Sequence, residues 1–293
     1  MSVFAVSILV ESAGFGLVTA AVLALAAVGF TLQFAVSGVL NLAYGGVMVV
    51  AAYVTYCVNQ RGLNVWVSAL VGIAAGALLS LLLNRVVYTP FQRRGTSPIG
   101  MVIVSLGMTL ILEFGTQAVA GPTNVSYSMS QGAALTAGGV VLTVVQVVII
   151  ALSVAAMLAV HALIRYTRLG KAMRATAANR NLARNCGIRT DRVVALTWAI
   201  TGALCGLAGV VFAINSGTFG ATSTDLFLVL ILAAVFLGGP GEPYGAMLGA
   251  LVIGLATEVS ASIIVSDYKD VVAFVILIAM LAVRPSGLLG ASA

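Results

Sequence analysis

Charged residues are scarce in this chain of 293 residues, which has 14 lysines and arginines and 8 aspartates and glutamates. A soluble domain carries about 25% charged residues, whereas charged residues make up 8% of this chain and apolar residues 61%. So few charges could not cover the surface of a soluble globule. The composition therefore excludes a soluble enzyme, a disordered chain and a nucleic-acid-binding domain, and the mean hydropathy of +1.15 indicates a polytopic membrane protein.

Residues that carry catalytic chemistry are also few. His161 is the single histidine, so the chain contains neither an HExxH metal motif nor an evident Ser-His-Asp triad. The three cysteines, Cys57, Cys186 and Cys205, have unrelated spacings and predict neither a disulfide framework nor a metal site. No GxxxxGK[ST] phosphate loop or GxGxxG dinucleotide motif is present. We therefore expect no enzyme, no catalytic residue, no metal and no cofactor of its own.

Long uncharged runs are the main feature that the sequence does have. A membrane-spanning helix needs about 20 apolar residues, and the bilayer core offers the backbone no water, so such runs form helices. They predict an all-α, polytopic transmembrane helical bundle with these spans: 14–36, 40–58, 63–84, 98–119, 138–161, 194–214, 222–238, 244–264 and 271–283. The count is eight or nine, because the segments at 222–238 and 271–283 are short. Short spans are either broken helices that line a pathway or ordinary tilted helices.

The distribution of basic residues predicts how the bundle is oriented. Cytoplasmic loops retain lysine and arginine. Twelve of the fourteen basic residues would lie on one side, at positions 85, 93, 94 and 284 and at eight positions within 165–192. We therefore expect the N-terminus outside and the C-terminus in the cytoplasm, with one long cytoplasmic loop at 165–192 in a single transmembrane domain, 1–293.

That loop, residues 165–192, has nine charges in 28 residues. Uncharged residues in it recur at spacings of 3, 4 and 4, which is one helical stripe: Ala175, Ala178, Leu182 and Cys186. With Gly170 before the stripe and Gly187 after it, the pattern predicts a helix of about four turns. Composition alone favours a solvated loop, and the alternative is a docking helix for a cytoplasmic partner.

Glycine pairs and carboxylates are the notable features inside the spans. Glycines four residues apart allow close helix packing, and they occur three times: Gly72/Gly76, Gly202/Gly206 and Gly245/Gly249. Two carboxylates, Glu113 and Glu258, lie near the outer ends of spans. Each is either an ordinary interface residue or part of a polar route for a solute. Two such groups are few for an ion relay across the bilayer, which counts against an ion-coupled secondary transporter.

Four stretches together resemble the permease subunits of bacterial branched-chain amino acid ABC importers. The resemblance covers nearly the whole chain, with the motifs in order: Gly29–Leu32 with Gly38–Gly46, Thr167–Ala175 with Asn179 and Gly187-Ile188, Gly238–Gly241 with Gly245–Ala250 and Glu258, and Arg284–Gly290. The chain departs from the family pattern at Asn41–Tyr44, where a Phe-Ala-His-Gly type of sequence is expected. No role of that histidine can therefore be transferred to Tyr44. Lys171 replaces an expected arginine and keeps its charge.

The resemblance implies a membrane-spanning permease subunit that translocates branched-chain or related amino acids by alternating access across a bacterial cytoplasmic membrane. Its implied partners are cytoplasmic ATPase subunits that use the ATP, a second permease subunit (the same chain or a sister chain) and an extracytoplasmic solute-binding protein. The segment that would contact the ATPase contains Gly170, Lys171, Arg174, Ala175, Ala178, Asn179 and Gly187. The candidate solute pathway contains Asn41, Tyr44, Gly45, Glu113 and Glu258.

Three other functions stay open at this point. Permeases for urea and short amides resemble this family closely, so the motifs do not name the solute. An ion-coupled secondary transporter would need no ATPase, and a non-transporting membrane scaffold would show no solute-dependent phenotype.

Overall fold

The computed structural model describes residues 2–129, 132–137, 140–263, 269–283 and 287–289, and it divides into two compact units. The first unit contains Met1–Val28, Met129–Ala155 and Val229–Ala293, and the second contains Gly29–Ser128 and Ala156–Leu228. Each unit is described by itself. Three helices pass from one unit to the other along the chain: α1 (Ser2–Ser37), α6 (Val144–Tyr166) and α10 (Asp225–Gly238).

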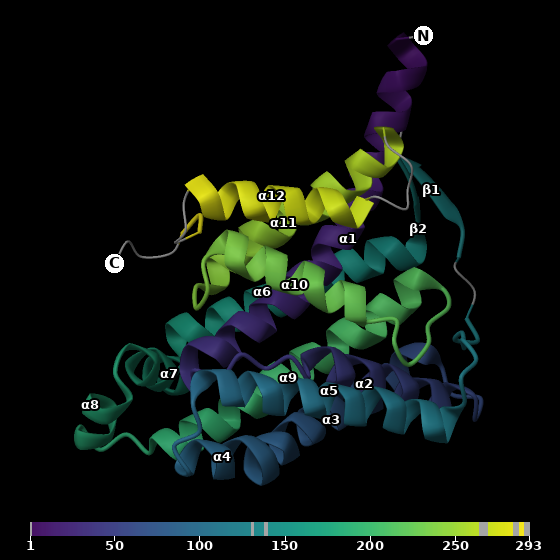
Figure 1. The fold of residues 1–293 in the computed structure, drawn as a ribbon. Helices are drawn as coiled ribbons and strands as arrows, with labels where there is room; N and C mark the ends of the chain where they lie inside the picture. The colour runs from purple at the N-terminus through teal and green to yellow at the C-terminus, as the bar shows by residue number, and fades with distance from the viewer. Residues whose placement is uncertain (1, 130–131, 138–139, 264–268, 284–286, 290–293) are drawn as a thin grey trace. The chain divides into compact units, whose positions relative to one another are not determined.

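The second unit contains most of the remaining helices, and the α-helices among them are labelled in Figure 1. They are α2 (Tyr44–Asn59), α3 (Val65–Leu83), the π-helical segment η1 (Asn84–Tyr88), α4 (Thr89–Arg93), α5 (Pro98–Ala120), α7 (Arg168–Ala178), α8 (Arg180–Asn185) and α9 (Thr190–Ser216). Within this unit α2 packs against α3, α5 and α9, and α3 packs along α9. This arrangement encloses the first half of α2 among other helices.

The chain is a helical, multi-pass membrane protein, as the apolar runs predict. Among the described residues, six helices are long and apolar enough to cross a bilayer: Glu11–Ser37, Val65–Arg93, Pro98–Ala120, Val144–Tyr166, Thr190–Ser216 and Pro243–Ser262. Three further apolar helices are shorter, at Tyr44–Asn59, Asp225–Gly238 and Val271–Val283. The total of eight or nine spans stays a prediction, because these three helices have 10–17 residues each.

The predicted start of the span at 138–161 is wrong. Strands β1 (Ala134–Ala137) and β2 (Val140–Thr143) pair antiparallel there, and the helix begins only at Val144. A reciprocal capping box sets this boundary, because the Thr143 hydroxyl accepts from the Gln146 amide at 3.3 Å while the Gln146 side chain accepts from the Thr143 amide at 2.9 Å. The Thr-x-x-Gln spacing is visible in the sequence and would have placed the helix start correctly.

Two of the predicted glycine pairs face each other across α3 and α9. We call this contact the glycine seam: Gly72, Gly76, Gly202 and Gly206. A Cβ added at Gly76 would lie 2.7 Å from the Gly202 carbonyl oxygen and 2.9 Å from the Gly206 Cα. The backbones of the two helices therefore touch directly, which is the packing that small residues at four-residue spacing permit in a membrane.

In the first unit, glycines allow α10 and α11 (Pro243–Ile263) to approach closely beside the turn that joins them. Helix α12 (Lys269–Val283) packs on α11. A Cβ on Gly238 would overlap the Gly245 backbone, so the two helices meet at this point without side chains between them. After the turn, the Leu288 and Leu289 amides donate to the carbonyls of Leu237 and Gly238, at 2.8 and 3.0 Å. Backbone hydrogen bonds therefore hold the end of the described chain on α10.

Candidate functional site

The site begins where α1 ends, in the second unit. Gly38 has φ +67°, a left-handed conformation that glycine adopts without a steric penalty, and it terminates α1. The irregular segment 38–43 follows, and α2 starts at Tyr44 without any side-chain cap. Asn41 in this segment is only 3% exposed, and its side-chain oxygen accepts a hydrogen bond from the Tyr88 hydroxyl. The Gln92 amide donates to the Ser37 carbonyl at 3.1 Å. The break between α1 and α2 is therefore held from η1 and α4.

Tyr44 lies at the first position of α2 and is fully enclosed. Its ring packs edge-on against Phe30, with centroids 5.6 Å apart, and a Cβ on Gly29 would overlap its hydroxyl. Gly29 is therefore required to make room for the tyrosine. The hydroxyl neighbours the Cys205 thiol, but that thiol donates to the Tyr44 carbonyl at 3.2 Å, and the hydroxyl makes no hydrogen bond of good geometry in the described part of the chain. A buried hydroxyl without a partner is costly for stability, which makes it a candidate group for a polar solute.

The two glycines after Tyr44 bring α2 close to two other helices, and we call this place the junction. Its residues are Gly45, Gly46, Thr109, Glu113, Thr224 and Asp225. The Thr224 hydroxyl donates to the Gly45 carbonyl at 3.1 Å, and a Cβ on Gly46 would lie 2.9 Å from the Leu112 Cβ. The starts of α2 and α10 thus meet the middle of α5.

The face of α5 that is buried in the unit carries polar groups at four-residue spacing: Met101, Ser105, Thr109 and Glu113. The two hydroxyls bond within α5, Ser105 to the Val102 carbonyl and Thr109 to the Ser105 carbonyl. Glu113 differs, because its carboxyl neighbours that of Asp225, at the start of α10, close enough for one proton to be shared between them, and one of the Glu113 oxygens has no partner among the described residues. Since Glu113 is 3% exposed, that unpartnered oxygen lies inside the unit.

Asp225 is positioned by the segment that precedes it. Val125 and Phe219 exchange two backbone hydrogen bonds of 2.9 Å, and the rings of Tyr53 and Tyr127 both pack on Phe219 with centroids 5.2 Å away. The Tyr127 hydroxyl donates to the Ala52 carbonyl at 3.0 Å, and burial raises its pKa further above the ordinary value of about 10, so it stays a neutral donor. This aromatic cluster fixes the loop that delivers Thr224 and Asp225 to the junction.

Four of the five predicted pathway residues belong to the second unit: Asn41, Tyr44, Gly45 and Glu113. The fifth, Glu258, belongs to the first unit, where it lies on α11 and accepts a hydrogen bond of 3.0 Å from the Thr19 hydroxyl. Glu258 therefore has a structural partner on α1. Its part in a solute route stays a prediction.

The four-turn helix predicted between Gly170 and Gly187 is wrong. The segment forms two short helices, α7 and α8, because Asn179 adopts an extended backbone (φ −159°, ψ 105°) between them. The Asn179 side chain accepts from the Leu182 amide and so caps α8. Ala175 and Ala178 consequently do not continue one stripe into Leu182 and Cys186.

The two predicted boundary glycines of this segment have different roles. Gly170 lies inside the first turn of α7, where a Cβ would overlap the carbonyls of Leu163 and Ile164 on α6. Thr167 is the residue that caps α7, accepting from the Gly170 amide at 2.9 Å. Gly187 has φ +84° and ends α8, as predicted for a glycine after a helix.

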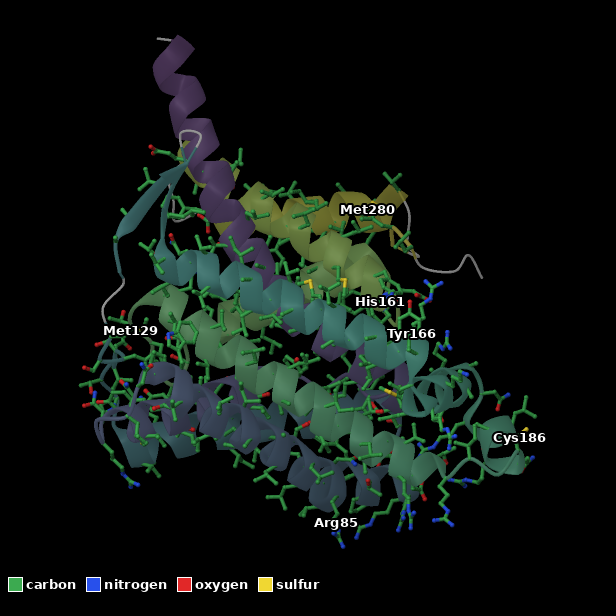
Figure 2. The ribbon with its side chains drawn as sticks, turned by 180° about the vertical axis from the view of Figure 1, so that it is seen from behind. Arg85, Met129, His161, Tyr166, Cys186 and Met280 are labelled. Carbon is green, nitrogen blue, oxygen red and sulfur yellow. The ribbon has the colours of Figure 1, made fainter. Side chains whose placement is uncertain are left out.

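The α7–α8 segment presents a basic, open surface. Lys171, Arg174 and Ala178 are exposed, whereas Met173 and Thr176 are buried against the unit. Arg180 and Arg184 both pair with Asp191, at 3.2 and 3.4 Å. Figure 2 shows Arg85, Tyr166 and Cys186 at the same end of the second unit, where nitrogen-bearing side chains gather. This clustering agrees with the uneven distribution of basic residues along the sequence.

The comparison with known families decides what kind of protein carries this site. The family model described as "Branched-chain amino acid transport system / permease component" matches residues 12–281. The chain belongs to this permease family.

Several permeases of known families are similar to the chain. It is 32% identical over 284 residues to the high-affinity branched-chain amino acid transport system permease protein LivH of Escherichia coli K12, and the match covers 91% of each chain. It is 30% identical to the corresponding protein BraD of Pseudomonas aeruginosa, with 94% of each chain covered. A fructose import permease, FruF of Bifidobacterium longum, is 27% identical over 78% of the chain and 64% of FruF. Permeases named for amino acids and for a sugar are thus both among its relatives.

A solved structure shares the fold. The permease matches a chain of PsaBC from Streptococcus pneumoniae, solved in complex with a Fab, with a TM-score of 0.53. The match covers 93% of this chain and 91% of that chain at 14% sequence identity. It supports the helical membrane fold alone.

Sequence reasoning missed several residues that shape the site. Thr224 and Asp225 fall inside the predicted span 222–238 and are not among the predicted site residues, although an acid at a helix start is a recognisable signal. Thr109 is not predictable as a site residue, because a single threonine in an apolar helix forms no pattern. Tyr88 and Trp198 stack with centroids 4.8 Å apart although they are far apart in the chain, and no local pattern predicts such a contact.

Proposed function

We propose that this permease is the membrane-embedded subunit of an ATP-driven importer for branched-chain or related amino acids. The match of the family model across residues 12–281 carries this proposal. The partners would be cytoplasmic ATPase subunits, which would use the ATP, a second permease subunit and an extracytoplasmic solute-binding protein. The N-terminus would lie outside and the C-terminus in the cytoplasm.

The solute route would run past the break between α1 and α2. A polar solute needs partners within the bundle, and the second unit encloses a hydroxyl at Tyr44 and a carboxyl oxygen at Glu113 that have no hydrogen-bond partner among the residues described. Broken helices near such groups are a recurrent way to build a solute site in a membrane. Alternating access would follow if this break moves when the ATPases close.

The α7–α8 segment would receive that movement. Lys171, Arg174 and Ala178 are exposed on this segment, while α7 itself packs on α9. Trp198 of α9 stacks on Tyr88, which in turn bonds to Asn41 beside the break. Displacement of α7 thus has a packed route to the candidate solute site.

A reconstituted importer tests the function. The permease, its partner ATPases, a sister permease if required and the binding protein are placed in proteoliposomes, and leucine uptake is followed with ATP on the ATPase side. We expect uptake that needs ATP and is unaffected by collapsing ion gradients. Uptake driven by an ion gradient without ATP would instead establish a secondary transporter. Uptake of urea or acetamide with leucine excluded would assign the alternative solute class.

Ala178→Trp tests the ATPase contact. Ala178 is exposed, so a large side chain there leaves the unit intact but overpacks a partner's groove. Overpacking a close contact costs about 1–3 kcal/mol, which weakens association by roughly 5- to 150-fold. Co-purification of the ATPase and solute-stimulated ATP hydrolysis measure the effect, with Ala133→Trp at an exposed position before β1 as the matched control. Normal association and normal stimulation of Ala178→Trp would refute the contact.

A further inference from the structure

The junction contains two acidic side chains from different helices and no basic side chain that neutralises them. The carboxyl groups of Glu113 on α5 and Asp225 on α10 are neighbours, because Leu112 and Thr224, the residues just before them, contact the adjacent glycines Gly46 and Gly45. In the part of the chain that the structure describes, the ion pairs join Arg180 and Arg184 to Asp191, and neither junction carboxyl takes part in one. A carboxyl group within a membrane bundle normally pairs with a cation or lines a polar pathway. The pair therefore lacks a counter-charge that the chain itself could have provided.

The position of Glu113 shows that this deficit lies inside the unit. The residue is 3% exposed, and one of its two carboxyl oxygens has no hydrogen-bond partner among the described residues. The hydroxyls one and two turns earlier on the same face of α5, Thr109 and Ser105, are satisfied by backbone carbonyls. The unsatisfied oxygen is therefore specific to the acidic end of this face. A buried acceptor without a donor is poised to receive one from a ligand.

The surroundings of the pair supply acceptors and little else for a ligand. The Thr224 hydroxyl, next to Asp225, already donates to the Gly45 carbonyl. Thr109 likewise donates to its own helix. Acidic oxygens with their neighbouring donors already engaged match a ligand that brings donors and a positive charge. A primary ammonium group meets both conditions, because it has three donors and no acceptor.

We propose that the Glu113–Asp225 pair receives the ammonium group of the transported solute. This inference rests on the proposed transport function and adds a selection rule to it. Solutes with a protonated amine, such as amino acids, would be favoured at the junction, and neutral solutes such as urea, amides and sugars would gain nothing there. The Asp225 side chain is exposed and would meet the amine first, and the enclosed Glu113 would hold it.

Uptake by the reconstituted importer gives the first test. Glu113→Gln and Asp225→Asn keep the shape of each side chain and remove its charge. A hydrogen bond to a charged group contributes substantially to the free energy of binding, so each change should lower leucine uptake roughly 10- to 100-fold. The double variant should be little worse than the stronger single one, because the two residues hold the same group. Glu11→Gln, which removes a carboxylate at an exposed position, is the matched control.

Ligand-dependent stability of the purified permease gives the second test and does not depend on transport. In sodium-free buffer, millimolar leucinamide, which has the amine and no carboxylate, should raise the melting temperature of the wild-type chain. The acid 4-methylpentanoate, which has the same side chain and no amine, should leave it unchanged. The shift with leucinamide should vanish in Glu113→Gln.

The outcomes separate the inference from the proposed function. An equal leucinamide shift in wild type and Glu113→Gln, or leucine uptake by both single variants within twofold of wild type, would overturn the ammonium assignment. A shift produced by sodium chloride and not by leucinamide would also overturn it, in favour of an inorganic cation. If the wild type imports no leucine while the leucinamide shift depends on Glu113, the proposed solute fails and the amine site stands.

Discussion

The glycine seam and the junction lie in the same unit and use the same residue type for opposite purposes. At the seam, glycines on α3 and α9 remove side chains so that backbone meets backbone, with a Cβ at Gly206 only 3.1 Å from the Gly72 carbonyl oxygen. At the junction, an added Cβ on Gly46 would lie 2.9 Å from the Leu112 Cβ of α5 and one on Gly45 would lie 3.4 Å from the Thr224 hydroxyl, so α2 meets side chains there, and polar groups are enclosed beside it. Unpartnered atoms of Tyr44 and Glu113 lie near or in the junction.

The difference teaches how to separate packing from function in a bundle this apolar. A close approach that leaves every neighbour apolar or bonded lowers the free energy of the fold. A close approach that leaves a hydroxyl or carboxyl oxygen unsatisfied raises it, by about 1–3 kcal/mol for each group. Such a cost is expected where a ligand later supplies the missing partner. Mutations at the seam should therefore change the stability of the protein, and mutations at the junction should change its transport activity.

The largest effect is expected at the seam. Gly76→Leu would place a side chain against the Gly202 carbonyl and the Gly206 Cα, where no flexible side chain can yield. Overpacking of this kind costs about 3 kcal/mol or more. Thermal unfolding of the purified protein should show a large loss of stability, and the protein should be poorly retained in the membrane.

Gly107→Ala is the control for that change. Gly107 lies in the middle of α5 with no neighbouring atom within 4 Å of an added Cβ. Alanine favours a helix over glycine by about 1 kcal/mol, so this variant should be as stable as wild type or slightly more stable. Equal destabilisation by Gly76→Leu and Gly107→Ala would mean that the seam has no special packing role.

A smaller effect is expected at Tyr88, whose hydroxyl donates a hydrogen bond to Asn41 in the break between α1 and α2. Tyr88→Phe keeps the ring on Trp198 but removes the hydroxyl that donates to Asn41. Because Asn41 is buried, its oxygen would lose its partner, at a cost of about 1–2 kcal/mol. We expect a modest fall in melting temperature together with a fall in leucine uptake.

The exposed residue Tyr166 provides the comparison for this variant. Its side chain is 73% exposed, so Tyr166→Phe should change neither quantity. If Tyr88→Phe behaved in the same way, the Asn41 contact would be irrelevant to both fold and transport.

The contrast between seam and junction also explains what could be predicted from sequence. Glycines four residues apart are a local pattern, so the sequence predicts close packing on α3 and on α9, whereas the contact between these two pairs is visible only in the structure. Helix ends were predicted where a glycine follows a helix, as at Gly187, and missed where a polar side chain sets the boundary, as at Thr143 and Asn179. The partnership of Glu113 with Asp225 joins residues 112 positions apart. No period or spacing encodes such a contact, and only the packing of α5 against the start of α10 creates it.

The smallest effect on stability, and the sharpest test of the comparison, is expected for Tyr44→Phe. The ring would keep its edge-on packing against Phe30, while the hydroxyl that lacks a partner would be removed. Removing an unsatisfied buried group relieves its desolvation cost, so the free energy of unfolding should stay unchanged or rise by about 1 kcal/mol. Uptake should nevertheless fall, because a polar solute would lose a donor on its route. Chemical or thermal unfolding and uptake are measured on the same preparation. Tyr88→Phe is the control, because the hydroxyl that it removes has a hydrogen-bond partner. A loss of stability in Tyr44→Phe with uptake unchanged would refute the role of Tyr44 on the solute route. It would show that Tyr44 is a packing residue, like the glycines of the seam.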